Sequence, residues 1–214
     1  MCLPQFSDRD AATVSVTFTV HNRDHTVIIS SVYMAIEDQP PPLRMEQLTQ
    51  HCMANNLPLI IASDTNSHHP SWGSGDYNHR GLILSEYIAT TNLEVVNCGA
   101  ESTFCSGNKR TVIDVTFANT MLYKDVHGWQ VMSTDTMSDH RQIQFVIKRD
   151  RCAPSTSGWH RLRPEVKLAA QQLATWECYA NLMANGLPPC WRSTIFYYSI
   201  WNRFSNVNSA ACRR

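Results

Sequence analysis

Apolar and polar residues alternate near the start of the chain in a pattern that predicts a β-hairpin. From Thr13 to Val20 every second residue is apolar, as expected of a strand with one buried face. A polar turn follows at 21–24. The β-branched run from Thr26 to Tyr33 then predicts a second strand, which would pair with the first.

The next segments alternate between helical and extended patterns. Apolar residues at helical spacing predict a helix from about Leu43 to Asn55, directly after the prolines at 40–42. The short apolar run at 59–62 predicts a strand that is buried on both faces. The same criteria predict one further helix, at 80–91, and three further strands, at 93–96, 111–118 and 142–148.

Interleaved strands and helices that give way to mostly strands are typical of an α/β fold. We therefore expect a layered α/β sandwich with mixed β-sheets. Residues 154–158 have the composition of a linker, which predicts a domain at 1–150 and a separate tail at 151–214. Within the tail, residues 164–184 can form an amphipathic helix, and the remainder has no clear periodicity.

The formal net charge of zero hides an uneven distribution of charge along the chain. Residues 1–150 carry 10 Lys+Arg and 16 Asp+Glu, whereas residues 151–214 carry 8 and 2, together with four of the six tryptophans. An acidic domain is not a general surface for nucleic acid, so binding of a polyanion must be local to a site. The basic, Trp-rich tail either stacks on single-stranded nucleic acid or is a terminus without fixed structure.

Cysteine usage and targeting signals favour an intracellular protein. The eight cysteines include no C-x-x-C pair, and the first ten residues lack the features of a secretory signal. No stretch approaches the roughly 20 apolar residues that a membrane span needs. We expect reduced thiols, an intracellular location that is nuclear for an active enzyme, and no membrane partner.

Polar side chains follow the buried strand at 59–62. Asp64 and Asn66 lie in the position where α/β folds place ligands and chemistry, beyond the carboxyl end of a strand. Both could reach a single metal ion or phosphate. The alternative explanation is an Asx turn, because Asp and Asn bond their own backbone well.

Other polar residues lie within or at the ends of predicted strands, where the periodicity does not account for them. Tyr33 ends a strand, Asp114 interrupts a strand whose neighbours face the other way, and Asp139 and His140 precede the last strand. Each also has a structural explanation, such as a core aromatic, a loop-bonding carboxylate or surface decoration. Together with Asp64 and Asn66, these residues supply carboxylates, an amide, a phenol and an imidazole, and the sequence has no glycine-rich phosphate loop. This set of groups fits metal-assisted attack of water on a phosphodiester.

The segments that contain these residues occur in a recognisable order. They are Ser63–His69, Trp72–Ser74, Arg80–Gly81, Asn92–Asn97, Ser102–Phe104, Ile113–Ala118, Trp129 and Ser138–His140. In this order and spacing the chain resembles the endonuclease/exonuclease/phosphatase superfamily. In detail, over roughly residues 10–148, it resembles the apurinic-type endonuclease domain of non-LTR retrotransposons of the jockey and R1 kind.

The resemblance implies a metal-dependent DNA endonuclease and assigns roles at the end of the buried strand. Asp64 would orient or deprotonate the attacking water, and Asn66 would steady the water or the scissile phosphate. Tyr33 would lie near that phosphate. His68 and His69 follow the retroelement pattern and either shape the loop or touch the substrate.

The resemblance also assigns the residues ahead of the last strand. His140 would bind the phosphate, with Asp114 holding its tautomer. Asp139 would join Asp64 and Asn66 in a site for Mg²⁺ or Mn²⁺, cations that prefer oxygen ligands. The resemblance leaves open whether Asp64 or His140 takes the proton from water.

The start of the chain departs from the family pattern. A full domain of this family begins with about two further strand–helix units, which supply an Asn and the principal metal-binding Glu, whereas the first glutamate here is Glu37. The sequence therefore indicates an N-terminally truncated copy with weakened metal binding. DNA is the expected partner. The alternatives are a phosphatase or lipid phosphodiesterase on the same scaffold, and a catalytically dead fragment that at most binds nucleic acid.

Overall fold

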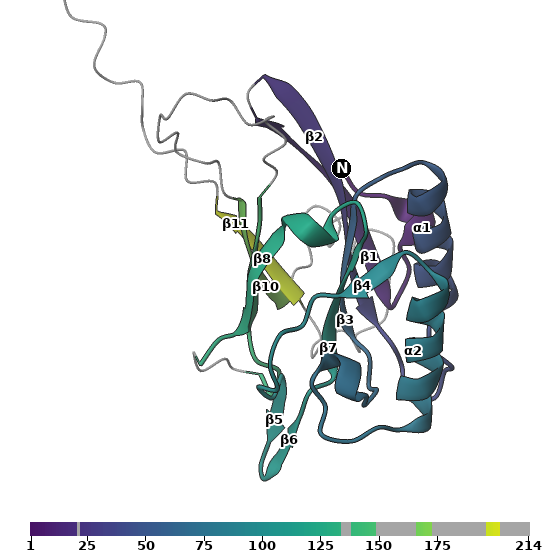
Figure 1. The fold of residues 1–214 in the computed structure, drawn as a ribbon, viewed down its shortest axis with the longest axis vertical. Coiled ribbons are helices and arrows are strands. Elements are labelled where there is room, and N and C mark those ends of the chain that lie inside the picture. The colour runs from purple at the N-terminus through teal and green to yellow at the C-terminus, as the bar shows by residue number, and fades with distance from the viewer. Residues whose placement is uncertain (21, 134–137, 149–165, 173–195, 202–214) are drawn as a thin grey trace, which may run out of the picture.

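A mixed sheet between two other layers forms the centre of the molecule (Figure 1). The computed structural model describes residues 1–20, 22–133, 138–148, 166–172 and 196–201. The central sheet has five strands in the order β1 (Ala11–Val20), β2 (Arg23–Tyr33), β3 (Leu59–Asp64), β7 (Asp114–Asn119) and β4 (Leu93–Val95). Strands β2 and β3 run parallel, and the other neighbours are antiparallel, so the sheet is mixed as predicted.

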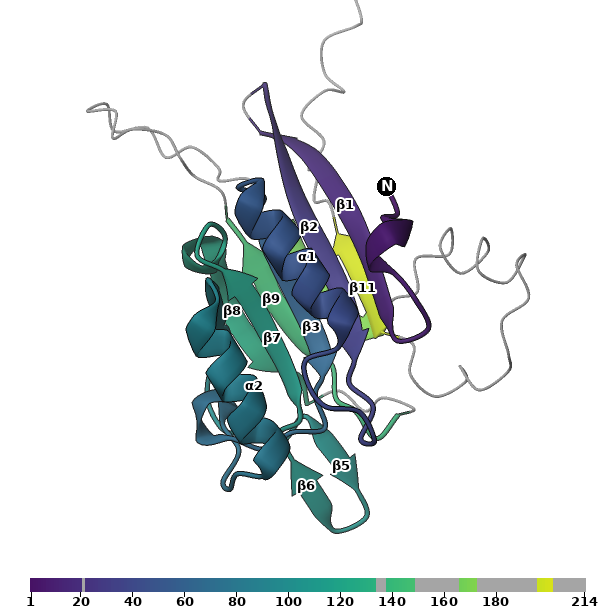
Figure 2. The same ribbon diagram turned by 90° about the vertical axis from the view of Figure 1, so that its right-hand side faces the viewer.

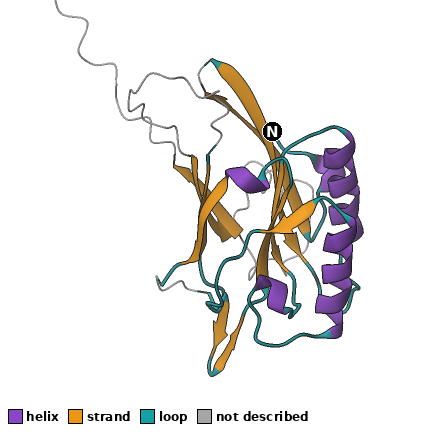
Figure 3. Cartoon of the chain, in the orientation of Figure 1, coloured by secondary structure: helices purple, strands orange, loops and turns teal. Residues whose placement is uncertain are grey.

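Helices α1 (Leu43–Ala54) and α2 (His79–Thr90) cover one face of this sheet (Figures 1 and 3). Both lie within a residue of the predicted bounds. Asn78 caps the N-terminus of α2, because its side chain accepts a hydrogen bond from the backbone N–H of Gly81 and so satisfies a free helix donor. Within the described residues, no helix is both long enough and apolar enough to cross a membrane.

A second sheet packs on the opposite face of the central one. Its four strands are ordered β11 (Phe196–Trp201), β10 (Val166–Gln172), β9 (Ile143–Ile147) and β8 (Val126–Val131). A short hairpin of β5 (Phe104–Ser106) and β6 (Lys109–Thr111) projects beyond both sheets (Figure 2). Three 3₁₀ helices complete the described elements: η1 (Pro4–Phe6), η2 (Pro70–Trp72) and η3 (Tyr123–Asp125).

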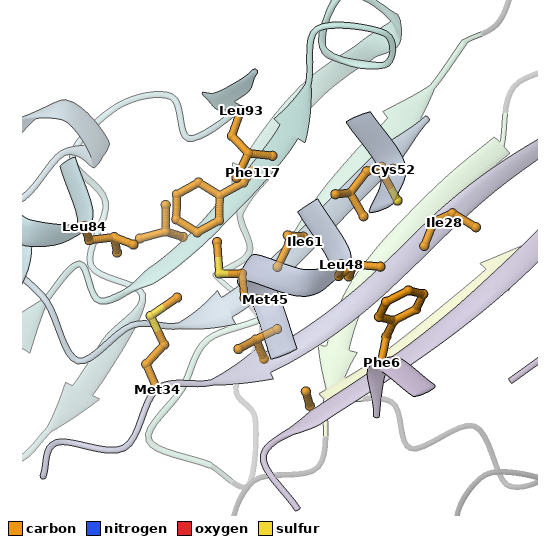
Figure 4. Packing of buried hydrophobic residues seen from close by; sticks show 14 of the residues in the cluster. Phe6, Ile28, Met34, Met45, Leu48, Cys52, Ile61, Leu84, Leu93 and Phe117 are labelled. Carbon is orange, nitrogen blue, oxygen red and sulfur yellow. The ribbon is translucent and has the colours of Figure 1, made fainter. Parts of the chain in front are cut away.

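The central sheet is buried on both faces, which explains why β3 is wholly apolar before Ser63. Ile61 packs toward the helices with Met45, Leu48 and Phe117 (Figure 4). Its neighbour Ile60 belongs instead to the cluster between the two sheets, which includes Trp129, Ile143 and Phe145. Burial of each such side chain stabilises the fold by about 1.5–3 kcal/mol.

Several expectations about secondary structure were wrong. The single strand predicted at 111–118 is two elements, because β6 ends at Thr111 and β7 begins at Asp114. Strand β8 was not predicted. Gly128, at φ +62°, interrupts its alternation where the pairing register with β9 shifts.

The helix expected at 164–184 is wrong at residues 166–172, which form β10 and pair with β9. Val166, Leu168 and Ala170 recur at every second position, so the sequence also satisfies a strand pattern. The rest of that predicted helix lies outside the described residues. The division at residue 150 stays a prediction, although β10 and β11 extend the same sheet as β8 and β9.

The expectation of reduced thiols holds for Cys52, Cys98 and Cys105. It is wrong for Cys2, which is disulfide-bonded. The spacing of the cysteines could not reveal this, because partners in a disulfide are close in space and not in sequence.

Candidate active site

The pairing of three neighbouring strands places three polar residues side by side. Tyr33 at the end of β2 is paired with Asp64 at the end of β3, and Asp64 is paired with Asp114 at the start of β7. The two carboxyl groups are almost fully buried, with 4% of Asp64 and 2% of Asp114 exposed. A second layer covers each face of the central sheet, so Asp114 is buried beside Asp64 although it interrupts an apolar pattern.

His140 lies between the two carboxylates. Its Nδ1 is 3.0 Å from both carboxylate oxygens of Asp114, and its Nε2 is 3.8 Å from Oδ2 of Asp64. A β-bridge to Phe104 fixes the backbone of His140, and the two rings meet edge to face with centroids 4.9 Å apart. The imidazole is therefore oriented by Asp114 and directed toward Asp64.

The environment moves the protonation equilibria of this pair in ways that suit proton transfer. Burial raises the pKa of Asp64 to about 7, with a further rise from the charge of Asp114 and a partial offset from His140. Burial alone would lower the pKa of His140. Its hydrogen bond to Asp114 and the charges of Asp114 and Asp64 outweigh burial, so that this pKa is raised.

Asn66 connects Asp64 to the segment that follows Tyr33. Its backbone has φ of +47°, a left-handed conformation that asparagine tolerates, and its N–H donates to Oδ1 of Asp64 at 3.2 Å. This is the Asx turn considered above, and it occurs within the site. The Asn66 side-chain amide donates to the carbonyl of Met34 at 3.2 Å.

The Tyr33 hydroxyl belongs to the same group of side chains. Burial raises the pKa of Tyr33, with smaller rises from the charges of Asp64 and Glu37, and a hydrogen bond from Asn66 opposes these effects. The phenol therefore stays protonated at neutral pH and can donate a hydrogen bond.

Two residues that the sequence did not single out for chemistry hold β7 in place. The Thr103 hydroxyl accepts the backbone N–H groups of Ile113 and Asp114 at 3.1 and 3.0 Å. The Asn97 amide donates to the carbonyl of Asp114 at 3.0 Å and accepts the N–H of Thr116 at 2.8 Å. Both side chains bind the backbone of β7. In the sequence, the only sign of this role was that both residues lie within segments that resemble the family motifs.

His68 and His69 are engaged within their own loop. Nδ1 of His68 is 2.7 Å from Oδ1 of Asp76, and Nδ1 of His69 is 2.8 Å from the hydroxyl of Ser71. Through these contacts both histidines help to shape the loop.

The residues expected to hold a cation do not make a complete site. The Asp139 side chain is exposed, and its backbone carbonyl accepts the N–H of Cys105 at 2.7 Å. Among the residues that the structure describes, no group of three or more His, Cys, Asp or Glu side chains is arranged to hold a metal ion. The donors in this part of the chain therefore do not by themselves complete a site for Mg²⁺ or Mn²⁺.

Of three solved structures compared with this chain, the first supports the fold. The endonuclease domain of TRAS1, a telomere-specific non-LTR retrotransposon, superposes with a TM-score of 0.59 at 22% identity, over 71% of this chain and 69% of that one. The APE2 catalytic domain of Xenopus laevis gives 0.48 at 17% identity, over 62% and 52% of the two chains. A mannosyl-6-phosphatase of Bacteroides thetaiotaomicron gives 0.41 at 14% identity, over 62% and 54%.

Comparison with sequences identifies the family. A search of curated proteins finds no match. The model of the endonuclease-reverse transcriptase family matches residues 27–144, which include Tyr33, Asp64, Asp114 and His140. With this match over more than half of its length, and with the fold of a retrotransposon endonuclease, the chain belongs to the endonuclease-reverse transcriptase family.

Proposed function

We propose that the chain is a DNA endonuclease that hydrolyses a phosphodiester with an activated water molecule. The observation that carries the proposal is the position of His140, which is bonded to Asp114 through one ring nitrogen and faces Asp64 with the other. The family match and the TRAS1 domain support nucleic acid as the substrate.

The protonation states of Asp64 and His140 suggest which residue binds the phosphate and which accepts the proton from water. With its raised pKa, His140 is the positively charged partner, and the N–H at Nε2 can bind a phosphate oxygen. Asp64, with a pKa of about 7, can take the proton from water near neutral pH. The water oxygen then bonds to phosphorus, the P–O bond to the leaving oxygen breaks, and that oxygen takes a proton from solvent.

Tyr33 and Asn66 would position the phosphate beside this pair. The protonated phenol of Tyr33 can donate to a phosphate oxygen, and Asn66 is fixed close to Asp64 through its backbone N–H. A divalent cation would neutralise charge on the phosphate. The described donors do not complete a site for such a cation, so the proposed steps use the chain's own residues and solvent.

Nicking of supercoiled plasmid DNA by the purified chain in the presence of Mg²⁺ tests this proposal. We expect relaxation of the plasmid by the natural sequence and a loss of roughly 10²–10⁴-fold in the Asp64→Ala variant. Glu94→Ala serves as the control, because Glu94 is an exposed carboxylate on β4. Equal nicking by the natural chain and the Asp64→Ala variant would refute the proposal.

The same assay separates the alternative functions. Faster hydrolysis of small phosphate monoesters than of DNA would favour a phosphatase on this scaffold. An inactive chain with no saturable response to Mg²⁺ would favour a fragment that only binds nucleic acid. The incomplete set of metal donors is the observation that keeps this last alternative in view.

A further inference from the structure

Arg80, in the first turn of α2, reaches into the loops that follow two strands of the central sheet. Its Nη1 donates to the carbonyls of Ile36, at 3.0 Å, and Asp38. Its Nη2 donates to the carbonyls of Met34 and Thr65, both at 3.3 Å. One guanidinium group thus connects the segment after β2 with the segment after β3.

Two of these acceptors are adjacent in sequence to residues of the candidate site. Met34 follows Tyr33, and Thr65 lies between Asp64 and Asn66. The Met34 peptide is a common point of attachment, since its N–H donates to the Asp64 carbonyl at 2.9 Å. Its own carbonyl accepts the side chains of both Asn66 and Arg80. A shift of Arg80 would therefore be transmitted to Asn66 and to the segment after Tyr33.

The chemistry of the guanidinium group suits this bracing role and argues against direct contact with substrate. The four terminal N–H groups match the four carbonyls, and the remaining donor, Nε, is buried without a hydrogen-bond partner in the described residues. No carboxylate of the described part of the chain forms an ion pair with Arg80. A lysine has a single nitrogen and three donors, so it cannot reproduce this arrangement.

We propose that Arg80 is a positioning residue for the active site, which ties the two loops together and fixes Asn66 and Tyr33 relative to Asp64. This inference rests on the proposed function for its effect on catalysis. Its structural part, the attachment of Asn66 through Arg80, can be measured whether or not the chain cleaves DNA.

The test compares Arg80→Lys with Arg44→Lys. Arg44 is a matched control because it also donates to a backbone carbonyl, that of Gln5 at 3.3 Å, but from the exposed surface of α1. We expect Arg80→Lys to lower kcat for plasmid nicking by roughly 10–100-fold, the cost of a small misplacement of catalytic groups, with KM for DNA nearly unchanged. Arg44→Lys should leave both unchanged.

An NMR measurement provides the readout that does not depend on activity. In Arg80→Lys the side-chain amide signals of Asn66 should shift and its protons should exchange faster with solvent. The indole N–H of Trp129, which donates to Thr116 at 3.0 Å within the core, should stay as in the natural chain. Arg44→Lys should change neither signal.

The outcomes distinguish the two proposals. If the natural chain does not nick DNA, the proposed function fails, and the Asn66 signals alone decide the role of Arg80. Unchanged Asn66 signals in Arg80→Lys would overturn the positioning role, whatever happens to kcat. An equal disturbance of the Trp129 signal would also overturn it, because Arg80 would then support the fold in general.

Discussion

Replacing Asp64 by asparagine should stabilise the folded chain at neutral and alkaline pH. The carboxyl group is 4% exposed and lies beside Asp114, and burial followed by that neighbouring charge raises its pKa from 3.8 to about 7. The folded chain therefore binds the Asp64 proton more tightly than the unfolded chain does. The resulting stabilisation is complete below the unfolded pKa and is lost as the pH rises through the folded pKa.

The size of the effect follows from the separation of the two pKa values. From about pH 5 to about pH 7 the carboxyl is ionised in the unfolded chain and mostly protonated in the folded one, so each pH unit costs the fold about 1.4 kcal/mol. The total loss over this range is about 2–3 kcal/mol. Asparagine has nearly the shape of the protonated carboxyl and carries no charge, so the variant avoids this loss.

Urea denaturation at about pH 5 and about pH 8, with a chelator present, measures the difference. The advantage of Asp64→Asn over the natural chain should grow by about 2–3 kcal/mol between the two conditions. Glu94→Gln is the control for loss of an exposed carboxylate, and its difference from the natural chain should stay constant. The reasoning fails if Asp64→Asn gains nothing at the higher pH, or if Glu94→Gln gains as much.

Four further substitutions, one of them a control, test the packing around the site. Gly81→Ala would place a Cβ 1.9 Å from the carbonyl oxygen of His68, so it should cost at least about 1–3 kcal/mol in urea denaturation. Gly75→Ala, with no atom within 4 Å, should change little, and equal losses would contradict the clash. Phe117→Ala, at a fully buried position between sheet and helices, should cost about 3–5 kcal/mol in the same assay, and a loss below about 1 kcal/mol would contradict that packing. Asn97→Ala should speed hydrogen exchange of the β7 amides by releasing the start of that strand, and unchanged protection would show that the amide bonds are dispensable.

Periodicity predicted the central layer well because local pattern and tertiary environment agree there. Met45, Leu48 and Cys52 recur at helical spacing and are buried on α1 as expected. The apolar run of β3 was correctly interpreted as a strand with two buried faces. Asp64 and Asn66 could be placed at a strand end because an abrupt change from apolar to polar residues marks that position in the sequence.

Other features depend on contacts that local sequence does not encode. β8 was missed because Gly128 breaks its alternation, and the segment at 166–172 satisfies both a helical and an extended pattern. The bracing by Arg80 and Asn97 was missed for a different reason. Both side chains bind backbone carbonyls or N–H groups of segments that are distant in sequence, and any residue can supply such partners.

The titration of the His140 imidazole by NMR, in the natural chain and in Asp114→Asn, tests most directly whether these residues form one site. The hydrogen bond that Nδ1 of His140 donates to the Asp114 carboxylate should hold the pKa of His140 above its ordinary value of 6.5 in the natural chain. In Asp114→Asn the charge of the Asp114 carboxylate is lost. The lowering effect of burial should then dominate, so that the pKa of His140 falls to or below that value. A pKa of His140 that is the same in both proteins would contradict the pairing on which the proposed endonuclease site depends.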